Sequence, residues 1–225
     1  MNRKTLLALS GALLLLLSTA AAAMAAAAGP AVTIRIEGAK KTLLLPTRVR
    51  GRTGWITRDG APKGQCSATS AQGALNVATR GHWSGQWYPS YHEYFITSIL
   101  GERPTGSNYW AIFVNNRPAS VGACDIKLRA GEQLLFAVSN GSQMAAALDA
   151  PRTAVSGRAF TIRLVGYGKA VRPLSGVRIT GNGIRAVRTD RRGEARVLDD
   201  HAGVLVLRAA PKGYVRTEAI VHVAS

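Results

Sequence analysis

The stretch Tyr109–Val138 (YWAIFVNNRPASVGACDIKLRAGEQLLFAV) constrains the fold of this chain most, because apolar runs alternate in it with residues that favour tight turns. Tyr109–Val114 is apolar and aromatic, and Asn115-Asn116 tolerates the positive φ angles of a two-residue hairpin turn. Gly122–Leu128 is predicted to resume the sheet, and Leu134–Val138 is a continuous apolar run suited to a buried strand. The stretch therefore predicts three strands joined by two tight turns.

Two adjacent aromatic residues begin this stretch. Successive side chains of a strand point to opposite faces of the sheet, so Tyr109 and Trp110 are expected on different faces. Only one of them can pack in the core against a helix, and the other is then available at the surface. The sequence leaves open which of the two is exposed.

The residues before this stretch predict two more strands and one helix. Ala31–Glu37 alternates apolar and polar residues, and Thr42–Val49 follows it as a second strand. A helix is expected within Ser67–Thr79, begun by a capping box between Thr69 and Gln72. This order predicts an α+β fold: a β-grasp-like domain with one main helix on a mixed sheet, followed by a small all-β sandwich.

The sandwich is predicted from the C-terminal residues. Residues 147–157 are small and include a proline, which predicts a linker between a domain of residues 29–146 and a second domain of residues 158–225. About seven short strands follow, separated by Gly-Asn-Gly, Asp-Arg-Arg-Gly and Pro-Lys-Gly turns, a pattern typical of a small β-sandwich.

Residues 1–28 have the composition of a secretory signal peptide. Arg3 and Lys4 precede the apolar run Leu6–Leu17, and an alanine-rich segment ends at Ala28, the expected cleavage site. An uncleaved membrane anchor is the alternative, because the apolar segment is long enough to span a bilayer. The chain is therefore predicted to be secreted or extracytoplasmic, and it could be associated with the cell surface.

Cys66 and Cys124 are the two cysteines of the chain. An even pair in an exported protein favours a disulfide. The alternative is that Cys66, just before the predicted helix, has a lowered thiol pKa and acts as a nucleophile, with His82 or His92 as the base. That arrangement would make the protein a thiol hydrolase.

Aromatic residues are concentrated in the segment 82–94 (HWSGQWYPSYHEY). Such a cluster can form core, but aromatic residues interleaved with Gly, Ser and Pro in a loop are also typical of surfaces that bind flat apolar ligands or sugars. The candidate ligand-facing residues are Trp83, Trp87, Tyr88, Tyr91, Tyr109 and Trp110.

The formal charge is +17, or +15 without Arg3 and Lys4, and residues 151–225 carry +9 of it. For an exported protein, such a charge favours anionic lipid or an anionic cell-envelope polymer over nucleic acid. The alternative is that the charge has no specific partner, because the arginines are scattered along the chain. No zinc, P-loop or serine-hydrolase motif is present, so no metal site and no catalytic residues are predicted.

Several segments together resemble the DUF4430 family. The resemblance is carried by Thr33–Glu37, Ser67–Thr79, Tyr94–Glu102, Tyr109–Asn116 and Leu128–Val138. This family is similar to the C-terminal domain of the cobalamin carriers transcobalamin and intrinsic factor, and the resemblance implies a β-grasp fold and an exported or surface-attached protein. It also implies cobalamin as a conceivable ligand, with Trp83, Trp87, Tyr109 and Trp110 as candidate contacts. The helical partner domain of the carriers has no counterpart here.

A second resemblance concerns the predicted sandwich. Pro173–Val177, Thr189–Ala195 and Gly213-Tyr214 resemble the carboxypeptidase-regulatory-like or prealbumin-like domains of bacterial surface proteins. Such domains imply a stalk or spacer.

The sequence predicts a non-enzymatic, exported binding or adhesion module, in which a ligand-facing domain is carried on a β-sandwich spacer. Its partner is expected to be a small molecule, a protein or an anionic cell-envelope polymer, with membrane contact only through an uncleaved signal segment. Cobalamin-type binding and a thiol hydrolase are the alternatives.

Overall fold

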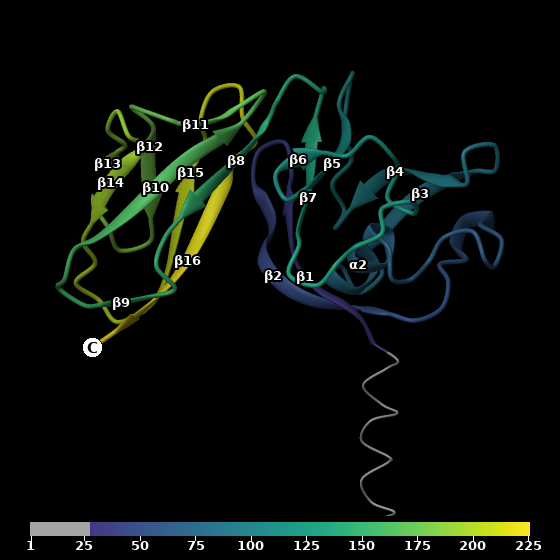
Figure 1. The fold of residues 1–225 in the computed structure, drawn as a ribbon, viewed down its shortest axis with the longest axis horizontal. Helices are drawn as coiled ribbons and strands as arrows, with labels where there is room; N and C mark the ends of the chain where they lie inside the picture. Colours follow the sequence, from purple (N-terminus) through teal and green to yellow (C-terminus); the bar gives the residue numbers. More distant parts are fainter. Residues whose placement is uncertain (1–27) are drawn as a thin grey trace, which may run out of the picture.

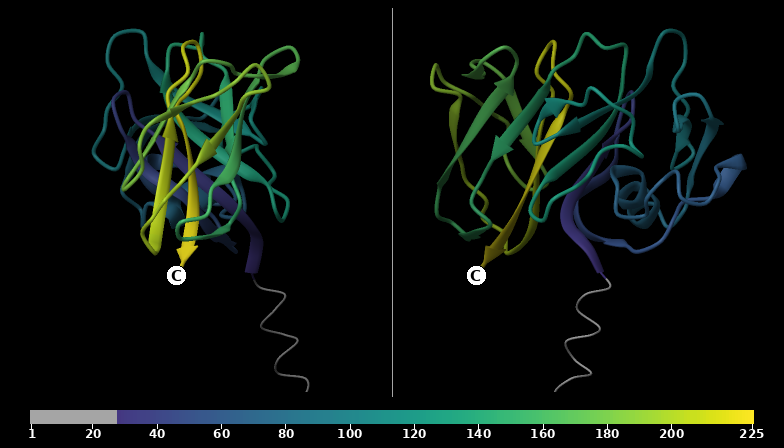
Figure 2. Two further views of the ribbon diagram at one scale, coloured as in Figure 1. Left: turned by 90° about the vertical axis from the view of Figure 1, so that its left-hand side faces the viewer. Right: turned by 45° about the vertical axis from the view of Figure 1, so that its right-hand side comes forward.

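The computed structural model describes residues 28–225, and the predicted signal peptide lies almost entirely outside the described residues. The chain forms two units, residues 28–139 and residues 145–224, which lie side by side along the long axis of the molecule (Figures 1 and 2). We call the surface between them the junction.

The N-terminal unit is built on a five-stranded sheet with the strand order β2-β1-β7-β5-β6. Its strands are β1 (Ala28–Glu37), β2 (Thr42–Arg52), β5 (Tyr109–Val114), β6 (Arg117–Pro118) and β7 (Gln133–Ser139). The central strand β7 pairs parallel with β1 and antiparallel with β5, so the sheet is mixed. A separate two-stranded hairpin consists of β3 (Trp83–Tyr88) and β4 (Glu93–Ile99).

The predicted hairpin turn and the predicted buried strand are both present. Asn115 and Asn116 have φ angles of 48° and 62° and connect β5 to β6. In β7 every residue after Gln133 is buried, because the sheet is covered on both faces. A strand with two covered faces needs a continuous apolar run rather than an alternating one.

The prediction that Gly122–Leu128 resumes the sheet is wrong. This segment leaves the sheet and crosses to the start of the helix, where the carbonyls of Ala123 and Ile126 accept hydrogen bonds from the amides of Gln72 (3.0 Å) and Ala71 (3.1 Å). The first amides of a helix have no partner within the helix, so the segment supplies carbonyl acceptors that a strand in the sheet could not offer.

The helix is shorter than predicted. Helix α2 covers Ala71–Ala78, and its N-cap is Ser70, whose hydroxyl accepts a hydrogen bond from the Gly73 amide at 3.4 Å. The predicted capping box does not form: the hydroxyl of Thr69 lies 2.8 Å from that of Ser67. The side chain of Gln72 is buried and makes no hydrogen bond within residues 28–225. A single turn of 3-10 helix, η1 (Arg58–Gly60), precedes α2.

The C-terminal unit consists of two sheets, one with the order β11-β10-β14 and with β8 also paired to β10, the other with the order β13-β12-β15-β16-β9. The strands of the first sheet are β8 (Ala145–Asp149), β10 (Phe160–Tyr167), β11 (Val171–Pro173) and β14 (Glu194–Val197). Those of the second are β9 (Thr153–Val155), β12 (Arg178–Gly181), β13 (Val187–Arg188), β15 (Gly203–Ala209) and β16 (Thr217–Ala224). Both sheets contribute side chains to one apolar core, which includes Leu164, Ile179, Leu207 and Val221.

The segment 147–157, predicted as a linker, is not a free connector. It contains most of β8, which pairs antiparallel with β10, and all of β9, which pairs parallel with β16. The predicted boundary at residue 146 therefore falls inside a strand of the C-terminal unit.

The predicted α+β class is wrong, because the described residues are mostly β. Strands make up about half of the structure, and α2, with eight residues, is the one α-helix in residues 28–225. Several sheets, one curved as a half-barrel, replace the single mixed sheet with a main helix. The sequence pattern overestimated the helix because Ser67–Ser70 instead forms turns and bridges before it.

The two faces of the N-terminal sheet are covered differently. One face packs on α2 and the β3–β4 hairpin through a large apolar core that includes Ile34, Ile36, Leu75 and Phe136. The other face contacts the C-terminal unit. Its apolar part is a small cluster of Phe113, Leu135, Ala137, Ala145 and Val215.

The junction also contains buried charged side chains. Arg35 Nη1 lies 3.3 Å from Glu218 Oε2 and 3.5 Å from Glu37 Oε1, and it donates to the Arg216 carbonyl at 2.6 Å. Arg216 Nε donates to Glu37 Oε2 at 3.0 Å. These residues come from both units, so the charges link them directly.

The hydroxyl of Thr42 lies between two carboxyl groups of this network. The Oγ1 atom of Thr42 is within hydrogen-bond distance of both Glu37 Oε2 and Glu218 Oε1. A hydroxyl has one proton to donate, so it can donate to only one of these two carboxyl groups. Burial raises the pKa of Glu37 to about 8, and the neighbouring Glu218 adds to this rise, while Arg35 and Arg216 oppose it.

Candidate functional site

The two cysteines form a disulfide, as predicted. The Sγ atoms of Cys66 and Cys124 are 2.05 Å apart, and neither cysteine is free. The bond ties the segment before α2 to the crossing segment 122–128. A disulfide sulfur is not a thiolate nucleophile, so the hydrolase interpretation based on Cys66 is contradicted.

The six candidate ligand-facing residues divide into two groups. Trp83, Trp87 and Trp110 are buried in the core that covers α2. Tyr88, Tyr91 and Tyr109 are exposed. The three tyrosines, and not the tryptophans, are therefore able to contact a ligand in this conformation.

The buried aromatic residues of the β3–β4 hairpin form a packed layer. Tyr94 lies between Trp83 and Trp87, with ring centroids 5.1 Å and 5.0 Å away in edge-to-face geometry. The Tyr94 hydroxyl donates to the carbonyl of Arg58, whose guanidinium lies 4.7 Å from the Trp83 ring centre. Burial, and secondarily the charge of Asp59, raises the pKa of Tyr94 to about 12. This layer holds the inner face of the hairpin against the core, because edge-to-face pairs add to the stabilisation that burial gives.

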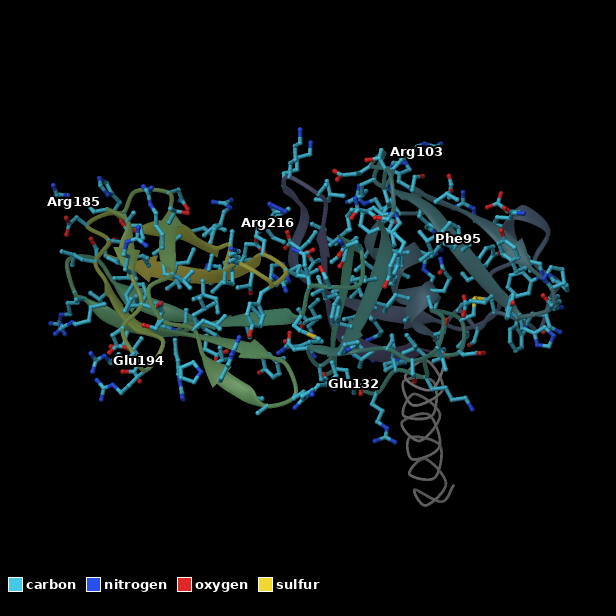
Figure 3. The ribbon with its side chains drawn as sticks, turned by 90° about the horizontal axis from the view of Figure 1, so that it is seen from above. Phe95, Arg103, Glu132, Arg185, Glu194 and Arg216 are labelled. Carbon is cyan, nitrogen blue, oxygen red and sulfur yellow. A yellow bond between two sulfur atoms is a disulfide. The ribbon has the colours of Figure 1, made fainter. Side chains whose placement is uncertain are left out.

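The outer side of the hairpin carries an open hollow of about 250 Å³, lined by Tyr88, Tyr91, Glu93, Tyr94 and Phe95. The exposed fraction is 39% for Tyr88, 74% for Tyr91 and 53% for Phe95. We call these residues the aromatic hollow. It lies on the part of the N-terminal unit away from the junction, as the position of Phe95 in Figure 3 shows.

Phe95 was not among the predicted site residues. Its position follows from the strand alternation: Tyr94 and Ile96 point inward and are buried, so Phe95 between them points outward. In β3 the same alternation buries Trp83 and Trp87, four residues apart, and exposes Tyr88. Period-two spacing was the available signal for dividing the aromatic residues between core and surface.

Glu93 supplies the one charged group of the aromatic hollow. Its carboxylate accepts hydrogen bonds from the amides of Tyr94 (2.9 Å) and Cys124 (2.9 Å and 3.1 Å). Burial raises its pKa, although these amides act in the opposite direction. Gly122 allows this approach, because a Cβ atom there would lie 2.1 Å from the Glu93 side chain. The carboxyl group is thus fixed in place beside the aromatic rings.

The structure decides between the two aromatic residues at the start of β5. Trp110 is 6% exposed and belongs to the core on the helix side, whereas Tyr109 is 41% exposed on the face toward the junction. Tyr109 does not line the aromatic hollow.

Two kinds of feature are absent from residues 28–225. In this part of the chain, no three His, Cys, Asp or Glu side chains gather as a metal ion would require. None of the helices described is both long enough and apolar enough to cross a membrane.

One protein family matches part of the chain: a family described as "Domain of unknown function (DUF4430)" matches residues 82–140. This confirms the DUF4430 resemblance for a region that runs from the start of β3 to the end of β7 and includes the aromatic hollow and Cys124. No curated protein matches the sequence.

Proposed function

We propose that this chain is an exported, non-enzymatic binding module whose aromatic hollow receives a ring of a carbohydrate. The observation that carries the proposal is the juxtaposition of three exposed aromatic side chains, Tyr88, Tyr91 and Phe95, around one hollow. Exposed aromatic side chains that gather on a fixed surface are uncommon on a protein with no partner, because their burial is favourable.

The chemistry of the hollow favours a sugar over a purely apolar ligand. A pyranose ring presents apolar C–H faces to an aromatic ring and hydroxyl groups around its edge. Tyr88 and Tyr91 contribute phenol hydroxyls that can donate or accept, and the fixed Glu93 carboxyl group can accept from a sugar hydroxyl. An apolar floor with a few convergent polar groups is the usual composition of a small-molecule site.

Cobalamin is less well supported. Of the four contacts that the carrier resemblance implies, Trp83, Trp87 and Trp110 are buried, and Tyr109 lies outside the aromatic hollow. Export remains part of the proposal and is supported by the signal-like residues 1–28 and by the disulfide. The C-terminal unit would act as the spacer that the carboxypeptidase-regulatory-like resemblance implies.

The proposal is tested by isothermal titration calorimetry with chitohexaose and cellohexaose. We expect the double variant Tyr88→Ala/Phe95→Ala to weaken binding by about 30-fold, because each of the two lost rings removes a stacking contact worth about 1 kcal/mol. Both side chains are exposed, so the variant should fold normally.

The matched control is Trp55→Ala/Tyr109→Ala, which also removes two exposed aromatic side chains but none that lines the hollow. It should bind like the wild type. Equal losses in the two variants, or no measurable binding of either sugar by the wild-type protein, would contradict the proposal.

A further inference from the structure

Basic side chains line a series of hollows that begins at the junction. The first hollow, of about 570 Å³, lies between the β1–β2 turn and the outer face of the sheet that contains β12 and β15. Its charged residues are Lys40, Lys41, Arg178, Arg208 and Arg216. Arg216 lies between the two units in Figure 3. Residues that are far apart in the sequence thus bring five cations to one surface.

Two neighbouring hollows continue this surface along the C-terminal unit. The second, of about 560 Å³, shares Arg178 with the first and adds Arg172 and Lys212. The third, of about 460 Å³, shares Arg172 and Lys212 with the second and adds Lys169. No Asp or Glu lines any of the three hollows. We call this continuous surface the basic track.

The cations of the basic track are largely without counter-charges. Arg216 pairs with Glu37, but the other seven form no ion pair with a carboxylate anywhere in residues 28–225. Arg178 is also directly opposite Arg188 in the pairing of β12 with β13. Like charges opposite one another destabilise a sheet, and a bound anion would remove this repulsion.

We propose that the basic track binds a linear polyanion, a phosphate-linked polymer of the cell envelope. The track is a chain of three connected hollows, each with the volume of a small-ligand site, so it fits an extended ligand better than a single small anion. Guanidinium groups pair with phosphate through two parallel hydrogen bonds, and four of the eight cations are arginines. A polymer with a charge in every repeat unit can satisfy cations along the whole track.

This inference goes beyond the proposed sugar site. The basic track and the aromatic hollow share no lining residue, and they belong to different parts of the molecule. The C-terminal unit would then be a second binding surface and not only a spacer. Failure of one site in an experiment leaves the other unaffected.

The test measures binding of fluorescently labelled inorganic polyphosphate to the mature protein by fluorescence anisotropy at 0.15 M salt. The variant Arg178→Gln/Arg208→Gln removes two exposed cations of the track, and we expect it to bind about tenfold more weakly. The dependence of log K on log salt concentration should become shallower by about two, one for each cation removed.

The matched control is Arg185→Gln/Arg191→Gln. These arginines are exposed and lie outside the track, and Figure 3 places Arg185 at the end of the C-terminal unit far from Arg216. The control removes the same net charge and should weaken binding by less than about threefold, by long-range electrostatics alone.

Three results would overturn the proposal. Equal losses in the two variants would mean that net charge, and not the track, attracts the polymer. Absence of polyphosphate binding by the wild-type protein would exclude the site. Tighter binding to polyglutamate, to single-stranded DNA or to vesicles of anionic lipid than to polyphosphate of equal charge would assign the track to a different partner.

Discussion

The two faces of the N-terminal sheet are built from the same strands but are covered in different ways. The helix face is covered by a large, mainly apolar core and is closed by α2, the β3–β4 hairpin and the Cys66–Cys124 disulfide. The junction face combines a small apolar cluster with the buried ionisable side chains of Arg35, Glu37 and Glu218. We infer that the helix face supplies most of the stability of the N-terminal unit, and that the junction face sets the position of the C-terminal unit.

The difference follows from the energetics of burial. Apolar burial is non-directional, so it specifies the arrangement of two packed units less strictly than paired charges do. Buried charges cost desolvation energy unless each has its partner, so a wrong arrangement of the two units would leave charges unpaired. Arg35 contacts both Glu218 and the Arg216 carbonyl, which ties β1 to the start of β16.

The largest expected effects on the free energy of unfolding come from replacing one phenylalanine on each face of the sheet. Phe136→Ala should lower the free energy of unfolding by about 4 kcal/mol, because it opens a cavity in the large helix-side core. Phe113→Ala should lower it by about 3 kcal/mol, because the apolar cluster that it belongs to at the junction is smaller. Urea denaturation measures both values, and a larger loss for Phe113→Ala would contradict the proposed division of roles.

The free energy of unfolding is expected to depend on pH through the junction, with an effect of intermediate size. The pKa of Glu37 in the folded protein is about 8, above its ordinary value of 4.5. The folded state therefore binds this proton more tightly than the unfolded state, and the resulting stability is fully present below pH 4.5 and is lost as the pH rises toward 8. The free energy of unfolding should fall by at most about 1.4 kcal/mol per pH unit within this window.

The control for this prediction is Glu37→Gln, which cannot titrate but can still accept from Arg216. Its stability should vary less between pH 5 and pH 8 than that of the wild type, in chemical denaturation at a series of pH values. Parallel curves for the two proteins would show that Glu37 is not the titrating group.

The smallest effect on the free energy of unfolding is expected for a variant of Tyr109, at the margin of the junction face. Tyr109→Ala should change the free energy of unfolding by about 0.5 kcal/mol or less, because the side chain is 41% exposed. Replacing its neighbour Trp110, on the helix face, by alanine should lower the free energy of unfolding by about 3 kcal/mol. Similar thermal denaturation midpoints for the two variants would be inconsistent with the assignment of Trp110 to the core.

Features that depend on local chemistry could be predicted from the sequence. The Asn115-Asn116 turn follows from the tolerance of asparagine for positive φ, and the buried strand β7 follows from its unbroken apolar run. The disulfide follows from an even cysteine pair behind a signal-like segment. Each of these predictions rests on a local property of the residues, which holds whatever the rest of the fold is.

Features that depend on distant partners could not be predicted in this way. The segment Gly122–Leu128 has the composition of a strand, but its carbonyls are needed by the amides at the start of α2. The aromatic residues of segment 82–94 alternate along β3 and β4, but which face of this hairpin is buried depends on the core around α2. The basic track joins cations from the β1–β2 turn to cations of the C-terminal unit, so the scattered arginines gave no sequence signal.

We propose that Tyr88, Tyr91 and Phe95 form the contact surface for a sugar ring. The most direct measurement is a map of amide chemical-shift changes in the ¹⁵N-labelled mature protein during titration with chitohexaose and cellohexaose. We predict that the largest changes with a binding sugar occur around the aromatic hollow, between Gln86 and Phe95. Changes centred on Tyr109 or on the junction, or no saturable change with either sugar, would contradict this proposal.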